Sequence, residues 1–173
     1  MKELILGGAR SGKSRLAEER AQATGLDLFY VATGLPGDGE MTARIEHHRQ
    51  RRGPEWTLVE EPIFLAETLQ NCAGKNRCIV VDCLTLWTSN CLLSNLKACW
   101  KSQSEQLLDI MSILPGHVIF VSNEVGMGIV PMGHLSRCFV DESGWMQQRM
   151  ARNSDRVIFT IAGLPHILKG QLP

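Results

Sequence analysis

A glycine-rich loop close to the first residue constrains this chain more than any other feature. The run Gly7-Gly8-Ala9-Arg10-Ser11-Gly12-Lys13-Ser14 follows the apolar residues Leu4-Ile5-Leu6 and precedes a helical pattern. It matches G-x-x-x-x-G-K-[ST], the phosphate-binding P-loop. Such a loop needs glycine because its backbone curls with several N–H groups directed inward. A chance glycine turn is the alternative, but the position between a strand and a helix favours a site for a nucleoside triphosphate.

The P-loop and a later strand together predict a magnesium nucleotide. The Lys13 ammonium is expected at the β- and γ-phosphates, and the Ser14 hydroxyl is expected to bind Mg²⁺. The run Cys78-Ile79-Val80-Val81-Asp82 reads as a buried strand that ends in a carboxylate, the Walker B arrangement. Asp82 is therefore a second candidate for Mg²⁺, directly or through water. An ordinary turn aspartate at the end of a strand is the alternative.

The order of apolar segments predicts the fold class. Short β-rich runs alternate with longer amphipathic segments, which is typical of a parallel sheet covered by helices. Strands are expected at Glu3–Leu6, Leu28–Ala32, Cys78–Asp82, His117–Ser122 and Arg156–Ile161. Helices are expected at Lys13–Thr24, Gly39–Arg52, Ile63–Cys72, Leu84–Leu96, Ser102–Leu114 and Gly144–Asn153. The prediction is an α/β fold: a RecA-like P-loop NTPase with a mostly parallel sheet flanked by helices, as one domain over residues 1–173.

Composition narrows the class of partner. Lysine and arginine total 18, as do aspartate and glutamate, so no general field attracts nucleic acid or an anionic membrane. No charged-then-apolar leader precedes the first strand, and no apolar run approaches the ~18 residues of a membrane span. The expectation is a cytoplasmic protein without a membrane span. The six cysteines contain no C-x-x-C pair and are expected to be reduced and mostly buried.

Three further segments are candidates for ligand contact. The turn Ala32-Thr33-Gly34 lies where nucleotide is expected, although a plain turn explains it equally well. Trp56–Glu61 is a possible short strand, with Glu60 as a candidate for a ribose hydroxyl or an exposed surface residue. The loop Ser122–Pro131 has two glycines around one methionine, which is typical of a mobile lid or a close approach to substrate, or of a structural loop. Its candidate substrate-binding residues are Asn123, Glu124, Gly126, Met127 and Gly128.

The segment Glu40–Arg52 has an unusual load of histidine and arginine. In a helix Met41, Ile45 and His48 share one face, which the apolar members direct toward the protein. An inward His48 would have Arg44, Arg51 and Arg52 within one turn along the chain. A neutral imidazole is a competent nucleophile toward phosphorus, and arginines neutralise the oxyanions under attack. The alternative is a solvated basic helix whose histidine merely packs.

These motifs resemble the bifunctional adenosylcobinamide kinase / adenosylcobinamide-phosphate guanylyltransferase family of cobalamin biosynthesis. The resemblance spans nearly the whole chain. It is carried by residues 7–14, Tyr30-Val31-Ala32-Thr33, Glu40-Met41, Arg44-Ile45, His47-His48, Trp56, Glu60, Val81-Asp82-Cys83-Leu84-Thr85, the run at 122–131 and Gly163-Leu164-Pro165.

The resemblance implies two reactions. The terminal phosphate of ATP or GTP goes to the aminopropanol hydroxyl of adenosylcobinamide. GMP from GTP is then transferred onto that phosphate, which gives adenosylcobinamide-GDP and pyrophosphate. The resemblance also implies that the GMP is carried by a histidine, which is His48 by position, and that the assembly is a homo-oligomer, usually a trimer. The implied nucleotide contacts are residues 7–14, Ala32, Thr33, Gly34, Arg49, Gln50, Arg51, Arg52, Glu60 and Asp82.

The chain departs from the family pattern near its last expected helix. The family often has Arg-Asp-x-x-Gly-x-x-Asn-Gln there, whereas Val140 and Gln147 replace the arginine and the asparagine. The P-loop, the paired histidines and the Gly-Met-Gly loop are intact, so both activities are expected. Two alternatives stay open: a small-molecule P-loop kinase without nucleotidyl transfer, and a non-catalytic NTP-binding module.

Overall fold

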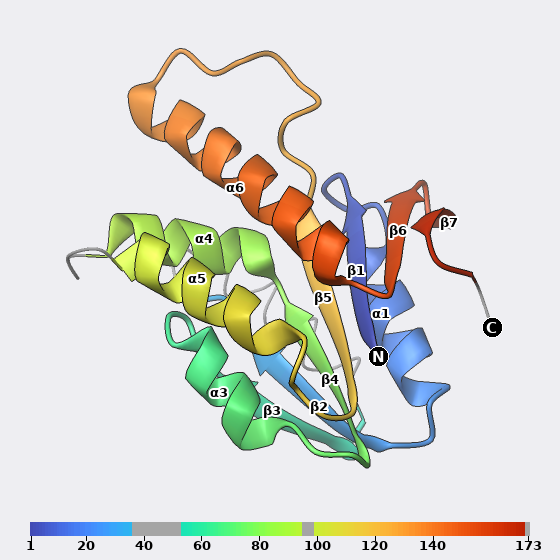
Figure 1. Ribbon diagram of the computed structural model, residues 1–173. Coiled ribbons are helices and arrows are strands. Elements are labelled where there is room, and N and C mark those ends of the chain that lie inside the picture. The colour runs from blue at the N-terminus through green and yellow to red at the C-terminus, as the bar shows by residue number, and fades with distance from the viewer. Residues whose placement is uncertain (36–52, 95–98, 172–173) are drawn as a thin grey trace.

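Seven strands form one sheet in the computed structural model, which describes residues 1–35, 53–94 and 99–171 (Figure 1). The strands lie in the order β3-β2-β4-β5-β1-β6-β7. All neighbours pair in parallel except β6 and β7, which are antiparallel. The strand bounds are β1 Lys2–Gly7, β2 Asp27–Ala32, β3 Trp56–Glu60, β4 Arg77–Asp82, β5 His117–Asn123, β6 Arg156–Ile161 and β7 Leu164–Lys169.

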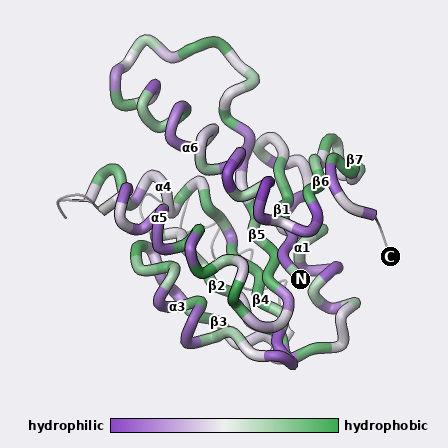
Figure 2. Tube along the Cα trace, in the orientation of Figure 1, coloured by the Kyte–Doolittle hydropathy of each residue, from purple (hydrophilic) through white to green (hydrophobic). Residues whose placement is uncertain are grey.

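Helices cover both faces of this sheet (Figure 1). One face carries α1 (Lys13–Gln22), and the other carries α3 (Leu65–Cys72), α4 (Leu84–Leu93), α5 (Cys99–Met111) and α6 (His134–Asn153). Within β1, Leu4 and Leu6 pack toward α3–α6, whereas Ile5 packs toward α1. Because both faces are buried, the strands appear in the sequence as continuous apolar runs. Figure 2 shows hydrophobic residues along the strands.

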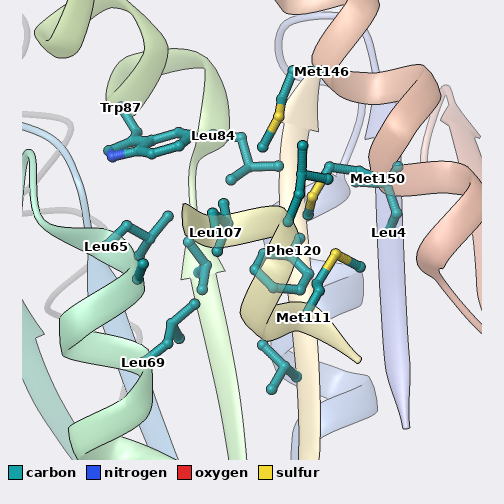
Figure 3. Close-up of a cluster of buried hydrophobic side chains, with 14 of the residues drawn as sticks. Leu4, Leu65, Leu69, Leu84, Trp87, Leu107, Met111, Phe120, Met146 and Met150 are labelled. Atoms are coloured by element: carbon teal, nitrogen blue, oxygen red, sulfur yellow. The ribbon is translucent and has the colours of Figure 1, made fainter. Parts of the chain in front are cut away.

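The larger core lies between the sheet and α3–α6 (Figure 3). Leu4 and Phe120 from the sheet are fully buried there against Met150 of α6 and Met111 of α5. Trp87 of α4 is also fully buried, and its indole N–H donates to the Ile63 carbonyl oxygen at 2.8 Å. No described helix is both long and apolar enough to cross a membrane.

The expected start of the last helix is wrong. The predicted helix began at Gly144, but α6 begins at His134 and carries Gly144 in its interior. A glycine inside a helix costs only about 1 kcal/mol, and contacts before Gly144 hold the added turns: the Trp100 indole N–H of α5 donates to the Glu142 carboxylate at 2.6 Å, and Ser143 is buried. The first half of α6 and the loop before it extend away from the sheet (Figure 1).

The edge strand β7 was missed altogether. It contains Pro165 and is largely exposed, and neither property marks a buried strand. The connection from β6 is the pair Ala162-Gly163, both with positive φ (52° and 80°), which is the geometry of a tight two-residue hairpin.

Smaller differences concern element ends. The helix expected to reach Thr24 stops at Gln22, because the Thr24 hydroxyl bonds back to the Ala21 carbonyl oxygen at 2.6 Å. The helix expected from Ile63 begins at Leu65, after the Glu61 carboxylate has accepted the N–H groups of Ile63 and Phe64.

The helix expected over Ser102–Leu114 spans Cys99–Met111, and the one expected to reach Leu96 ends at Leu93. The possible strand at Trp56 is confirmed as β3, and the expected helix Gly39–Arg52 lies outside the described residues.

A buried charge cluster holds the amino ends of the strands together. The Glu3 side chain is fully buried in β1 and accepts from Arg20 of α1 at 2.7 and 3.0 Å. His117 of β5 lies 2.8 Å from the same carboxylate, and Arg156 of β6 lies 3.2 Å from it. Burial alone raises the pKa of Glu3, but the hydrogen bonds and charges of His117 and Arg20 outweigh it and lower the pKa to about 2.

Candidate active site at the carboxyl edge of the sheet

The P-loop turns tightly between β1 and α1. Gly12 has φ of 97°, a left-handed conformation that disfavours any side chain. A Cβ on Gly12 would also lie 3.2 Å from the Gly163 Cα, and a Cβ on Gly7 would clash with the Thr160 carbonyl oxygen. Because Gly163 N–H donates to the Ser11 carbonyl oxygen at 2.9 Å, the β6–β7 turn buttresses the loop from outside. Sequence reasoning did not assign this role to the closing Gly-Leu-Pro.

Lys13 lies over its own loop. Its ammonium donates to the Gly8 carbonyl oxygen at 2.5 Å and lies 3.5 Å from the Ser11 hydroxyl oxygen, and only 6% of the residue is exposed. Ser14 follows in the first turn of α1 and is half-buried, while Gly8, Ala9 and Arg10 are exposed. This is the strand–loop–helix arrangement that binds phosphate groups through backbone N–H groups and one lysine.

Asp82 lies at the same edge but not on the neighbouring strand. It ends β4, and β5 runs between β4 and β1, so the two strands are roughly 10 Å apart. Tyr30 of β2 donates its hydroxyl to the Asp82 carboxylate at 2.7 Å, an orienting contact that the sequence did not reveal. Ser14 and Asp82 carry hard oxygen donors of the kind that Mg²⁺ prefers. The described residues contain no cluster of three or more His, Cys, Asp or Glu that would hold a metal by themselves.

The end of β5 is held by side chains from two helices. The Asn123 N–H donates to the Thr85 hydroxyl oxygen of α4 at 2.7 Å, and the Asn123 carbonyl oxygen accepts from the Gln147 amide of α6 at 2.8 Å. Gln147 also donates to the Ser122 hydroxyl oxygen at 3.2 Å. On the other side, Glu124 N–H donates to the Gly7 carbonyl oxygen at 2.9 Å, which ties this segment to the P-loop. Sequence reasoning missed Thr85 as a site residue, and it noted Gln147 only as a departure.

The turn after β2 carries a fully buried threonine. The Thr33 hydroxyl donates to the Cys83 carbonyl oxygen at 2.7 Å and accepts from the Cys83 N–H at 2.8 Å. These bonds tie the end of β2 to the segment that follows Asp82. The residues beside Thr33 in the predicted contact set, Ala32 and Gly34, are half-buried at the same edge, and their contact with nucleotide stays a prediction.

Of the remaining predicted nucleotide contacts, the structure describes only Glu60. Glu60 is exposed at the end of β3, beside Ala32 in the strand register and four positions from β1 in the sheet order. His48 and the run Arg49, Gln50, Arg51 and Arg52 lie outside the described residues, as does Arg44.

The loop between β5 and α6 is rich in exposed apolar side chains. Met127, Ile129, Val130 and Met132 are between 72% and 98% exposed, and we call residues 127–132 the apolar arm. At the base of the arm, Gly126 N–H donates to the Glu124 carboxylate at 2.5 Å. At its other end, the Arg137 guanidinium donates to the carbonyl oxygens of Pro131 and Met132.

A groove of about 410 Å³ runs between α6 and the β6–β7 hairpin. Its floor and walls are mostly apolar. The lining residues are Leu6, Glu124, Gly144, Gln147, Gln148, Ala151, Val157, Leu168 and Lys169. Leu6 is the penultimate residue of β1 and directly precedes the first P-loop residue, Gly7, so the groove begins beside the predicted phosphate site.

Comparison with solved structures confirms the predicted α/β P-loop NTPase fold. The flagellar accessory protein FlaH from Methanocaldococcus jannaschii superposes with a TM-score of 0.55 at 15% identity, over 98% of this chain and 78% of that chain. The RadB recombinase superposes with a TM-score of 0.51 at 14% identity, over 91% and 73% of the two chains. At these identities the likeness concerns the fold alone.

Comparison of sequences is more specific. A Pseudomonas aeruginosa protein named bifunctional adenosylcobalamin biosynthesis protein CobP is 53% identical over 171 residues, which are 99% of each chain. The Escherichia coli bifunctional adenosylcobalamin biosynthesis protein CobU is 34% identical and covers 93% of this chain and 96% of its own. The family model described as cobinamide kinase / cobinamide phosphate guanyltransferase matches residues 3–168. The chain therefore belongs to the cobinamide kinase / cobinamide phosphate guanyltransferase family, as its motifs predicted.

Proposed function

We propose that this chain catalyses both reactions named by its family. It phosphorylates the aminopropanol hydroxyl of adenosylcobinamide with ATP or GTP, and it then transfers GMP from GTP onto that phosphate. The observation that carries the proposal is the intact P-loop, with Lys13 folded over a glycine loop at the edge where Asp82 and Asn123 also end their strands. The near full-length match to bifunctional relatives supports the same conclusion.

For the kinase reaction, the chain's own residues bind and orient phosphates. Backbone N–H groups of residues 8–13 and the Lys13 ammonium neutralise the β- and γ-phosphate oxygens. Ser14 and Asp82 would hold Mg²⁺, which would supply positive charge to the transferred phosphoryl group. Tyr30 fixes the rotamer of Asp82 through its hydroxyl.

For the guanylyl transfer, His48 is the proposed nucleophile. Its neutral imidazole attacks the α-phosphorus of GTP, a nitrogen–phosphorus bond forms, and pyrophosphate leaves. The phosphate of the first product then attacks the same phosphorus and releases His48. Helical spacing and the family's paired histidines support this assignment, and Arg44, Arg51 and Arg52 are the proposed stabilisers of the oxyanions.

Labelling tests this step directly. Wild type, His48→Ala and the neighbouring control His47→Ala are each incubated with Mg²⁺ and GTP labelled at the α-phosphorus, then denatured and treated with acid or base. We expect wild type and His47→Ala to retain a label that acid removes and base does not, whereas His48→Ala retains none. If wild type phosphorylates cobinamide but retains no label, the protein is a small-molecule kinase without nucleotidyl transfer. If it binds nucleotide without any turnover, it is a non-catalytic binding module.

Assembly and location follow the family in this proposal. We expect a homotrimer in the cytoplasm, without a nucleic acid or membrane partner. The apolar arm supports an assembly, because four large apolar side chains exposed in one short segment are unusual for a monomer. Light scattering of the purified protein gives the mass directly, and a monomeric mass that persists at high concentration would refute the trimer.

A further inference from the structure

We propose that the groove between α6 and the β6–β7 hairpin binds the acceptor alcohol of the kinase reaction, and that Glu124 accepts its proton. This inference rests on the proposed function, since it needs an acceptor that carries a hydroxyl group at the end of an amide-linked arm.

The position of Glu124 carries the first step. It follows the last residue of β5, the strand that pairs directly with the P-loop strand β1. The hydrogen bond from Glu124 N–H to the Gly7 carbonyl oxygen fixes its main chain 2.9 Å from the start of the P-loop. Its side chain lines the groove. Glu124 therefore lies between the phosphate loop and the groove, where an acceptor hydroxyl must lie to meet the γ-phosphate.

The carboxylate is also held in one orientation. One oxygen accepts the Gly126 N–H at 2.5 Å, and the preceding residue is fixed through its carbonyl oxygen by Gln147. A general base needs this kind of fixed geometry within hydrogen-bond reach of the proton that it removes. Asp82 is less suited to the task, because it lies one strand farther from β1 and is bound by the Tyr30 hydroxyl.

The chemistry of the groove favours a neutral ligand over a nucleotide. Among the described residues that line the groove, the only cation is Lys169, which donates to the carbonyl oxygens of Ala151 and Arg152 at 3.0 and 2.9 Å and so caps the end of α6. The other charged group among these described lining residues is the Glu124 carboxylate, which would repel phosphate. Apolar walls from Leu6, Val157 and Leu168 suit an aliphatic arm, and Gln148 presents an amide to an amide-linked acceptor.

The reaction balances with groups already named. The acceptor oxygen forms a bond to the γ-phosphorus while the bond from that phosphorus to the bridging oxygen breaks. The nucleoside diphosphate leaves with the electron pair, and the hydroxyl proton goes to Glu124. The part of the acceptor that carries the hydroxyl group fits the groove if its volume is about 410 Å³ or less. The rest of a large acceptor stays outside the groove, over the exposed strand β7.

Gly144 offers a way to fill the groove without disturbing the fold. It lines the groove from the interior of α6, and a Cβ built there meets no atom within 4 Å. Replacing an interior helical glycine also favours the helix. Gly144→Leu therefore blocks the groove, and Arg149→Leu, an exposed residue of the same helix outside the lining, is the matched control.

Steady-state kinetics with cobinamide and ATP test the site. We expect Gly144→Leu to raise the KM for cobinamide at least tenfold, while the Kd for ATP and the labelling of the histidine by GTP stay within twofold of wild type. Arg149→Leu should leave all three unchanged. An unchanged cobinamide KM in Gly144→Leu would overturn the acceptor site.

Glu124→Gln tests the proton acceptor separately. The amide retains the size of the side chain and an oxygen for the Gly126 N–H, so folding is expected to be preserved. We expect the kcat for phosphorylation to fall about 100-fold, with little change in the KM for cobinamide and none in histidine labelling. If Glu124→Gln keeps the kcat of wild type, Glu124 is not the base, although the proposed bifunctional activity is unaffected. If the wild-type protein phosphorylates no cobinamide, the proposed function itself is refuted.

Discussion

The amide of Gln147 donates to the Asn123 carbonyl oxygen at 2.8 Å, and through this bond α6 sets the end of the strand beside the P-loop. The Thr85 hydroxyl oxygen accepts the Asn123 N–H at 2.7 Å, so side chains from two helices hold both main-chain polar groups of one residue. Gln147 and Thr85 are each only 7% exposed. Water therefore does not readily replace either bond if a partner is removed.

Replacing Gln147 tests whether this contact positions the site. Gln147→Leu leaves the Asn123 carbonyl oxygen without its buried donor, which should lower the free energy of unfolding by about 1–3 kcal/mol. We also expect kcat/KM for cobinamide phosphorylation to fall more than tenfold, since Glu124 follows Asn123 directly. Chemical denaturation and steady-state kinetics measure the two effects. Gln147→Asn, the residue often found in the family here, retains an amide on a shorter side chain and should recover part of the activity. Loss of stability with full activity would show that the bond is only structural.

The sequence predicted the parts of this fold that depend on local pattern. The P-loop and the apolar strands obey short-range rules, and all five of the strands expected from apolar runs are present. Contacts between distant segments were not predictable. Nothing near Tyr30 indicates that it binds Asp82, because the two residues meet only when β2 pairs with β4. The start of α6 was missed for the same reason, since the contact of Glu142 with Trp100 of α5 joins segments that are far apart in the sequence.

Stability at low pH should report on Glu3. Its folded pKa of about 2 lies below the ordinary value of 4.5, so the charged form stabilises the folded state fully above pH 4.5. This contribution, roughly 3 kcal/mol, is lost progressively as the pH falls from 4.5 toward 2. Urea unfolding of wild type between pH 7 and pH 2 should show that loss.

Removing the Glu3 charge gives the matching variant. Glu3→Gln leaves the cluster of Arg20, Arg156 and His117 without its buried carboxylate, which should lower the free energy of unfolding at pH 7 by about 3–5 kcal/mol. The exposed pair Arg15 and Glu19 is the control, and Glu19→Gln should cost less than about 1 kcal/mol. Equal effects of the two variants would contradict the importance of the buried cluster.

Two thiols should be inert in the folded protein. Burial raises the pKa of Cys83 to about 12 and that of Cys78 to about 11, and the thiolate is the reactive form. We expect iodoacetamide at pH 8 to leave both unmodified in native protein and to alkylate both in urea, as mass spectrometry of the peptides would show. Rapid native alkylation of Cys83 would mean that the segment after Asp82 opens in solution.

The hydroxyl of Tyr30 should influence the affinity for magnesium. It donates to the Asp82 carboxylate at 2.7 Å, and Tyr30→Phe removes this bond while keeping a ring in a site that is only 3% exposed. If Asp82 holds the metal, loss of an orienting hydrogen bond should raise the Mg²⁺ concentration for half-maximal phosphorylation by about tenfold. Trp56→Phe is the control, because the Trp56 ring packs edge-on against Tyr30 at 5.9 Å between centroids but does not bond Asp82. The enzyme is first treated with EDTA to abolish activity. Mg²⁺ is then titrated back at saturating ATP, and the Mg²⁺ concentration that gives half-maximal phosphorylation is measured. An unchanged midpoint in Tyr30→Phe would show that this hydroxyl does not tune a metal site at Asp82.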